Sequence, residues 1–232
     1  MFGLDADLVA LQEVALLSRD GDLVDNAGDL GRQLGMEVRY AAVRTFSVTD
    51  GNAVTGAGSF GNALLSRRPL RHARTVALPR APDDALIEPV GAGHPAAGIS
   101  YADAPATIRE PRCLLLAELD GLTVGTAHFS HVGSAERLLQ AEATVAAFAA
   151  ASPALLLGDL NAPIEAAELA AFRSWNDAFA VAPGDPARIS TDEGLLIDHV
   201  LTRGVSVDGC RIVRESGDLS DHYPVVAEVA SP

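Results

Sequence analysis

The sequence predicts a mixed α/β (α+β) fold, a four-layer α/β sandwich in which two mixed β-sheets lie face to face between helices. Short apolar runs typical of buried strands recur along the 232 residues, and only a few segments have helical periodicity. Mixed sheets covered by helices on both outer faces fit this order. With 48% hydrophobic residues and this length, we expect a single domain, 1–232, with a sizeable core.

The first predicted strand, 8–11, is an apolar run that leads directly into Gln12 and Glu13. Strands are also predicted at 37–43, 62–66, 113–119, 122–129, 154–160, 196–202 and 225–230. The pair Asp120-Gly121 is a turn dipeptide, so 113–119 and 122–129 are predicted to form a hairpin.

Two segments are predicted to be helical. In 134–151, apolar residues recur at helical spacing, and Ser134 stands where an N-cap is expected. The residues of this apolar face are Leu138, Ala141, Val145 and Phe148. A weaker pattern predicts a second helix over about 23–34.

The segment 78–112 is rich in Pro, Gly, Ala and Asp and has no clear periodicity. Long segments of this kind inside a domain are commonly functional loops or insertions. We interpret it as a loop insertion near the functional site, either a flap over that site or a plain surface insertion.

The charge of the chain limits its partners. Seventeen basic residues, all of them Arg, stand against 31 acidic ones, for a net charge of −14. Proteins that bind long nucleic acids by neutralising phosphates normally present a basic surface, so we expect no stable nucleic-acid complex. A small phosphorylated molecule, or a cation that offsets the carboxylates, fits better. Nothing in the sequence indicates an oligomeric state.

The sequence has no apolar stretch long enough to span a membrane and no signal peptide at its start. We therefore expect a cytoplasmic protein, or a secreted one if a signal segment precedes the printed start. Cys113 and Cys210 lie far apart in apolar stretches without metal-ligand spacing, so we expect buried free thiols.

Polar side chains end or interrupt several predicted strands. Asp159 and Asn161 follow an apolar run two residues apart, which would place both on one face at the rim of the sheet. Further residues of this kind are Glu13, His128, Asp198, Asp221 and His222. Each alone is ordinary, because Asp-x-Asn commonly forms an Asx-turn and Asp-His commonly a turn or cap. Together, carboxylates gathered on one side imply a compensating cation.

Two other histidines are assigned no functional role. His199 should face away from Asp198 because neighbouring strand residues point to opposite faces, and His131 has no distinguishing context. A serine or thiol hydrolase has little support, since the chain lacks a G-x-S-x-G elbow and neither cysteine lies near a candidate base.

Five segments resemble, in order, motifs of the endonuclease/exonuclease/phosphatase superfamily of metal-dependent phosphohydrolases, which includes deoxyribonuclease I. They are "DADLVALQEV", "GNALLSR", "TAHFSH", "GDLNAP" and "IDHVL…SDHYPV". The resemblance implies a four-layer sandwich with the site at one end. It also implies a hydrolase of phosphoester bonds (phosphodiesterase, nuclease or phosphatase). The substrate would be a phosphorylated small molecule, a phospholipid or a nucleic acid.

The resemblance also implies roles for individual residues. Glu13 and Asp221 match metal-binding carboxylates, with Mg²⁺ as the expected cation and Mn²⁺ as a possible substitute. Asp159 and Asn161 match residues that activate and orient the attacking water. His222 matches the histidine that contacts the scissile phosphate, and Asp198 matches the carboxylate that holds this histidine. His128 matches a donor to the phosphate or the leaving group, and Asn62 and Arg112 match positions near the cleft.

One departure from the family leaves an alternative open. The resemblance implies a further strand, ending in Asn, ahead of Gly3, and we expect the printed chain to lack it as an N-terminally truncated domain. A degenerate member that binds a phosphorylated ligand or a partner without turnover is therefore the alternative to a hydrolase.

Overall fold

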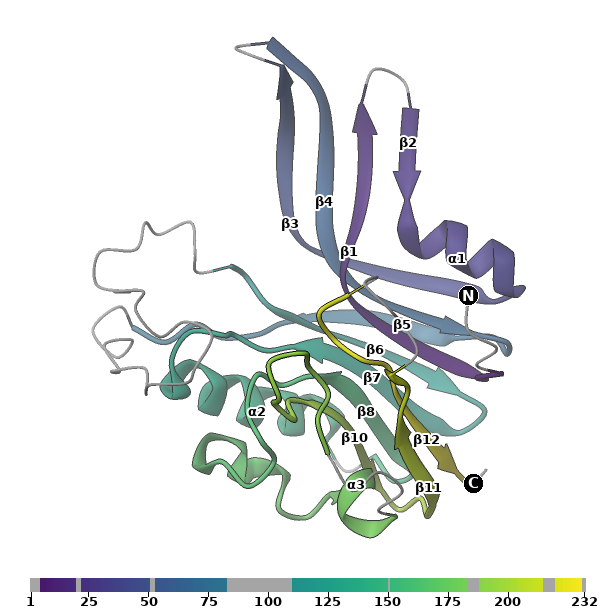
Figure 1. Ribbon diagram of the computed structural model, residues 1–232, viewed down its shortest axis with the longest axis vertical. Coiled ribbons are helices and arrows are strands. Elements are labelled where there is room, and N and C mark those ends of the chain that lie inside the picture. The colour runs from purple at the N-terminus through teal and green to yellow at the C-terminus, as the bar shows by residue number, and fades with distance from the viewer. Residues whose placement is uncertain are drawn as a thin grey trace.

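The computed structural model describes residues 5–19, 22–50, 53–82, 110–149, 151–182, 188–214 and 220–230. The strands and helices (Figure 1) are β1 (Leu8–Arg19), β2 (Asp22–Asp25), α1 (Asn26–Leu34), β3 (Glu37–Asp50), β4 (Ala53–Ser66), β5 (Arg71–Ala77), β6 (Cys113–Leu119), β7 (Leu122–His128), α2 (Ser134–Phe148), β8 (Ala154–Asp159), the 3₁₀ helix η3 (Ala167–Phe172), β9 (Asn176–Asp177), α3 (Ala178–Val181), β10 (Asp198–Arg203), β11 (Val207–Ile212) and β12 (Val225–Val229).

The strands form three sheets. A four-stranded sheet has the order β2-β1-β4-β3, and a six-stranded sheet has the order β5-β6-β7-β8-β10-β9. The short pair β11-β12 completes the set among the described residues. In Figure 1 the outer halves of β1, β3 and β4 extend beyond the rest of the molecule, and α1 and α2 lie on opposite sides of the stacked sheets.

Three hydrophobic clusters separate these layers. Between the two large sheets, Leu64 of the first packs with Leu115 and Val124 of the second. The outer face of the six-stranded sheet packs on α2 and η3, and the outer face of the four-stranded sheet packs on α1. Burying apolar side chains on both faces of both sheets is the main favourable term of this fold. The predicted four-layer α/β sandwich is confirmed, although only the six-stranded sheet is mixed, because the described strands of the four-stranded sheet all pair antiparallel.

Some local predictions are confirmed. The predicted hairpin is present, with β6 and β7 joined through Asp120 and Gly121, both at positive φ. Cys113 and Cys210 are buried free thiols. None of the helices in the described ranges is long and apolar enough to span a membrane.

Other local predictions are wrong. The N-cap of α2 is Gly133 rather than Ser134, and Leu138 of the predicted apolar face is 38% exposed. The helix predicted over 23–34 begins only at Asn26, because β2 pairs with β1 and Asp25 caps the helix by accepting a hydrogen bond from Gly28 N.

Two expectations lie outside the described residues. The loop proposed for 78–112 falls mostly on 83–109, and the further strand would precede residue 5. Both stay predictions.

Candidate functional site

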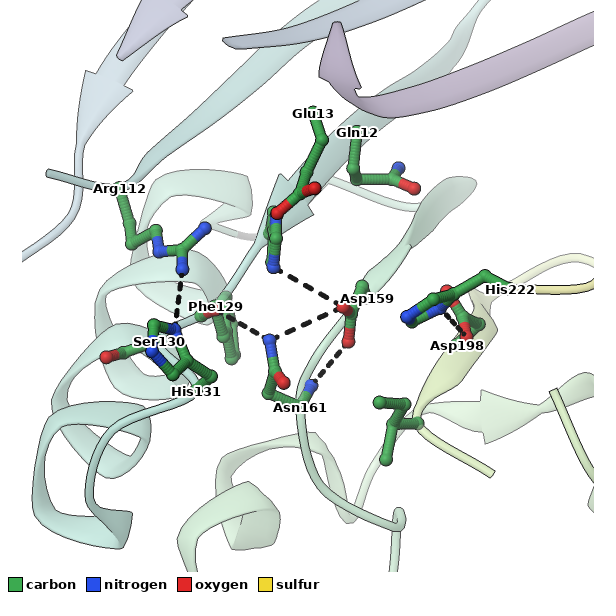
Figure 2. Close-up of polar contacts among 12 residues, drawn as sticks. Gln12, Glu13, Arg112, Phe129, Ser130, His131, Asp159, Asn161, Asp198 and His222 are labelled. Atoms are coloured by element: carbon green, nitrogen blue, oxygen red, sulfur yellow. Dashed lines mark hydrogen bonds and ion pairs between the residues drawn. The ribbon is translucent and has the colours of Figure 1, made fainter. Parts of the chain in front are cut away.

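Three neighbouring strands bring three of the predicted site residues side by side. His128 ends β7, Asp159 ends β8, and Asp198 begins β10. In the sheet His128 pairs with Asp159, and Asp159 with Asp198. The three residues therefore form one row across the end of the six-stranded sheet, with Asp159 in the middle. Figure 2 shows Asp159 beside Asp198 and His222.

The turn after β8 places Asn161 against Asp159. Asn161 has a φ of 52°, a left-handed conformation that Asn tolerates better than most residues. Its backbone N donates to Asp159 Oδ1 (2.8 Å), and its Nδ2 donates to Phe129 O (2.9 Å). The two side chains do meet, as predicted, but through this Asx-turn rather than through strand alternation, because β8 ends at Asp159.

A second group on the other side of Asp159 is the predicted pair of Asp198 and His222. His222 Nδ1 donates to Asp198 Oδ2 (2.8 Å), and Ser190 Oγ donates to the same oxygen (2.7 Å). The hydrogen bond to Asp198 raises the pKa of His222 to about 9, against the opposing effect of burial. At neutral pH this imidazole is therefore charged.

Asp159 is the most perturbed carboxylate of the site. Its side chain is buried, and burial together with the nearby Asp198 raises its pKa to about 7, although the hydrogen bond from Asn161 N opposes this. One ligand atom from each of Asp159, Asp198 and His222 lies within 4.8 Å of the others. Two carboxylates this close in a buried place are the arrangement that a cation relieves.

His128 connects Asp159 to Glu13. His128 Nε2 lies 3.3 Å from Asp159 Oδ2, and its Nδ1 lies 3.9 Å from Glu13 Oε1. Burial, with smaller effects of Arg112 and two neighbouring histidines, holds the pKa of His128 well below its usual value. These contacts are therefore those of a neutral ring rather than ion pairs.

The sequence suggested that the first strand ends at Glu13, but the structure shows that it continues. β1 continues to Arg19 through a bulge between Leu11 and Val14, and Glu13 stands in this bulge with a φ of 56°. A positive φ at a residue other than Gly costs about 1–3 kcal/mol, and such strain clusters at functional sites as well as in turns. Gln12 Nε2 donates to Thr126 Oγ1 of β7 (2.9 Å), and this bond connects the bulge to the six-stranded sheet. The side chain of Glu13 is 60% exposed.

Arg112 and Asn62, the two residues placed near the cleft from the resemblance, line one hollow. Its lining residues are Glu13, Val43, Phe60, Gly61, Asn62, Arg112 and His128. Asn62 Nδ2 donates to Cys113 O (3.1 Å) and so fixes the backbone next to Arg112. Arg112 is buried, its Nε has no hydrogen-bond partner among the described residues, and burial lowers its pKa.

Asp221 lies next to His222, and its charge contributes to the raised pKa of that residue. It is exposed, and it is not among the three side chains whose ligand atoms meet around Asp159. Its role as a cation ligand stays a prediction.

Two residues near the site were missed in the sequence. His131, which was assigned no role, accepts a hydrogen bond from Arg112 Nη2 (3.2 Å). Its position three residues after His128 was the available signal. Ser190 stands in a loop without any motif, so nothing in the sequence indicated its bond to Asp198.

Comparison with known proteins agrees with this geometry. The model of the "Endonuclease/Exonuclease/phosphatase family" matches residues 2–222. A protein described by that family name from Beutenbergia cavernae is 21% identical with a TM-score of 0.68; the match covers 96% of this chain but only 62% of that protein. A sequence search of curated proteins gives no match.

Two further solved structures have the same fold. The catalytic domain of human nocturnin, with a bound sulfate anion, is 15% identical at a TM-score of 0.63, covering 97% of this chain and 80% of that one. The 3′ phosphatase NExo from Neisseria, bound to a product DNA hairpin, is 17% identical at a TM-score of 0.61. The match covers 99% of this chain and 91% of that one. At these identities the likeness concerns the fold, whereas the family model spans nearly the whole sequence. The chain therefore belongs to the endonuclease/exonuclease/phosphatase family.

Proposed function

We propose that this protein hydrolyses phosphoester bonds with the help of a divalent cation, Mg²⁺ or Mn²⁺, at the residues around Asp159. The observation that carries the proposal is a buried carboxylate whose pKa is raised to about 7, placed between the neutral His128 and the charged His222. A base poised near neutrality is what general-base catalysis at physiological pH requires.

The residues fit a cation that prefers oxygen ligands. On the side of Asp159 that faces His222, few atoms are free to ligate a cation. Asp198 Oδ2 already accepts hydrogen bonds from Ser190 and His222, and a charged imidazole cannot bind a metal. Glu13 would hold the cation from the other side of Asp159, and Asp221, the residue next to His222, is the further ligand that the resemblance implies. When bound, Mg²⁺ would supply positive charge to a phosphate oxygen.

The protein's own groups divide the remaining work. Asp159 would accept the proton of the attacking water, and Asn161, fixed to Phe129 O, would orient that water. His222, held and kept charged by Asp198, would donate to a phosphate oxygen. His128 would donate to the phosphate or to the leaving oxygen as a neutral ring.

The substrate class is also a proposal. The Nε of the buried Arg112, which has no hydrogen-bond partner within the described ranges, is a donor suited to an anion beside the cation. The net charge of −14 favours a small phosphorylated molecule over a long nucleic acid. Binding to DNA that falls steeply with salt would instead indicate a nuclease.

The test is hydrolysis of bis(p-nitrophenyl) phosphate with and without Mg²⁺ or Mn²⁺. We expect cation-dependent turnover that Asp159→Asn lowers at least about a hundredfold, a typical contribution of a general base. The matched control is Asp192→Asn, the same change on an exposed carboxylate. Cation binding by calorimetry without turnover would contradict the hydrolase and favour the non-catalytic alternative.

A further inference from the structure

The strand β10 supports the site from both of its faces. Asp198 faces His222, whereas the next residue, His199, points into the core as predicted from strand alternation. The His199 side chain is completely buried. Its Nδ1 lies 2.8 Å from Asp177 Oδ2, and its Nε2 lies 2.9 Å from Ala162 O.

Both partners of His199 are hydrogen-bond acceptors. The partner of Nδ1 is the buried carboxylate of Asp177, and the partner of Nε2 is the backbone carbonyl of Ala162, which a ring N–H can approach this closely as a donor. Asp177 is itself fixed, because its Oδ1 accepts hydrogen bonds from Phe179 N (2.8 Å) and Ala180 N (3.2 Å) at the start of α3. The ring therefore stands on a rigid support.

The other contact of His199 leads to the site. Ala162 directly follows Asn161, the residue held at a φ of 52° beside Asp159. The backbone of this turn is held at two points, by the bond from Leu160 N to the carbonyl of Ile197, just before β10 (2.9 Å), and by the bond from His199 of β10 to Ala162 O. The second tie lies immediately after the strained residue.

We propose that His199 is a positioning residue: its Nε2–H holds Ala162 O and so keeps the Asn161 turn in the conformation that places Asn161 against Asp159. The assignment rests on the proposed function for its catalytic consequence, but not for its structural one. His199 touches no reacting group, since it lies on the face of β10 opposite Asp198. One strand thus orients His222 through one residue and the water-binding turn through the next.

Two conservative variants separate the two contacts of the ring. The amide nitrogen of Gln can stand near the place of Nε2, so His199→Gln keeps a donor toward Ala162 O. The amide nitrogen of Asn stands near the place of Nδ1, so His199→Asn keeps the donor toward Asp177. Thr202→Val is the matched control, because Thr202 is a buried residue of the same strand whose hydroxyl donates to Val205 O (3.2 Å) away from the site.

The first measurement is kcat and KM for bis(p-nitrophenyl) phosphate with Mn²⁺, well below the melting temperature of each variant. We expect His199→Asn to lower kcat at least about tenfold with KM nearly unchanged, and His199→Gln and Thr202→Val to stay within about threefold of the wild type. Equal losses in the two His199 variants, or losses that follow melting temperature across all three, would overturn the proposal.

The second measurement needs no turnover. Amide hydrogen exchange by NMR reports the opening of the turn at Asn161 N, which donates to Asp159 Oδ1. His199→Asn should speed exchange at Asn161 at least about tenfold relative to the amides of β8, and His199→Gln should not. If the wild type fails to hydrolyse the probe, the proposed function fails while this result still decides the role of His199. Unchanged exchange at Asn161 in His199→Asn would refute it.

Discussion

Replacing Asp159 by Asn should stabilise the cation-free protein while it abolishes turnover. Burial and the neighbouring Asp198 raise the pKa of Asp159 from 3.8 to about 7. This displacement of about three pH units corresponds to a penalty of about 4 kcal/mol on the ionised native state. Asn161 Nδ2, 3.4 Å from Asp159 Oδ2, would lose an acceptor at a cost of about 1 kcal/mol.

The net gain of about 3 kcal/mol has a defined pH dependence. A carboxyl whose pKa is raised on folding favours the native state below its unfolded pKa and loses that advantage as pH rises through the folded value. The gain from Asp159→Asn should therefore be small at about pH 4 and complete above about pH 8. For a domain of this size it corresponds to a melting temperature about 6–12 °C higher.

Calorimetric melting in chelator at several pH values measures this gain. Asp192→Asn serves as control, because its carboxylate is exposed. Adding Mg²⁺ should stabilise the wild type by about 2.7 kcal/mol at a hundredfold excess over Kd, and so raise its melting temperature. A variant no more stable than the wild type at high pH, or a gain independent of pH, would refute the reasoning.

Three other predictions concern neighbouring residues. Turnover of the diester probe should fall as pH rises through about 9, the pKa of His222, and Asp198→Asn should move this fall toward the ordinary histidine value near 6.5, measured as a pH–rate profile. Gly158→Ala should lower the free energy of unfolding in urea by about 3 kcal/mol, since its Cβ would stand 2.1 Å from Ala127 O. Arg112→Lys should raise KM for the probe about tenfold at nearly constant kcat in steady-state kinetics, because a single ammonium cannot replace the buried planar guanidinium.

The parts of the fold that were predictable are those whose pattern is strong and local. β6 has the predicted bounds, 113–119, because a continuous apolar run ends at a turn dipeptide. β5 (Arg71–Ala77) was missed because an exposed edge strand needs no apolar alternation. β1 was predicted too short because a bulge at Glu13 interrupts its pattern without ending the pairing.

The site divides along the same line. His128 and Asp159 could be predicted because each stands near the end of an apolar strand, and adjacent strands of one sheet bring their ends together. Asp198 was expected inside the strand 196–202, and the structure places it at the start of β10. The partners that set their chemistry could not be predicted. Ser190, which donates to Asp198, and His131, which accepts from Arg112, reach the site through the path of loops, and no local spacing encodes that path.

Four features that cost stability lie together at one end of the sheets. Asp159 is buried beside a second carboxylate, Arg112 Nε is buried with no partner in the part of the chain that the structure describes, and Glu13 and Asn161 both have positive φ. A protein that only held a phosphate would gain from Arg112 but would be opposed by a buried carboxylate, since like charges repel. In a hydrolase, by contrast, each of the four features would have a role, because the reaction needs a base, a cation and groups that hold the anion and the water. The stability gain expected from Asp159→Asn therefore measures how much folding stability the protein loses by keeping this carboxylate in the site. If the variant gains no stability, the strongest argument against a purely binding role is removed.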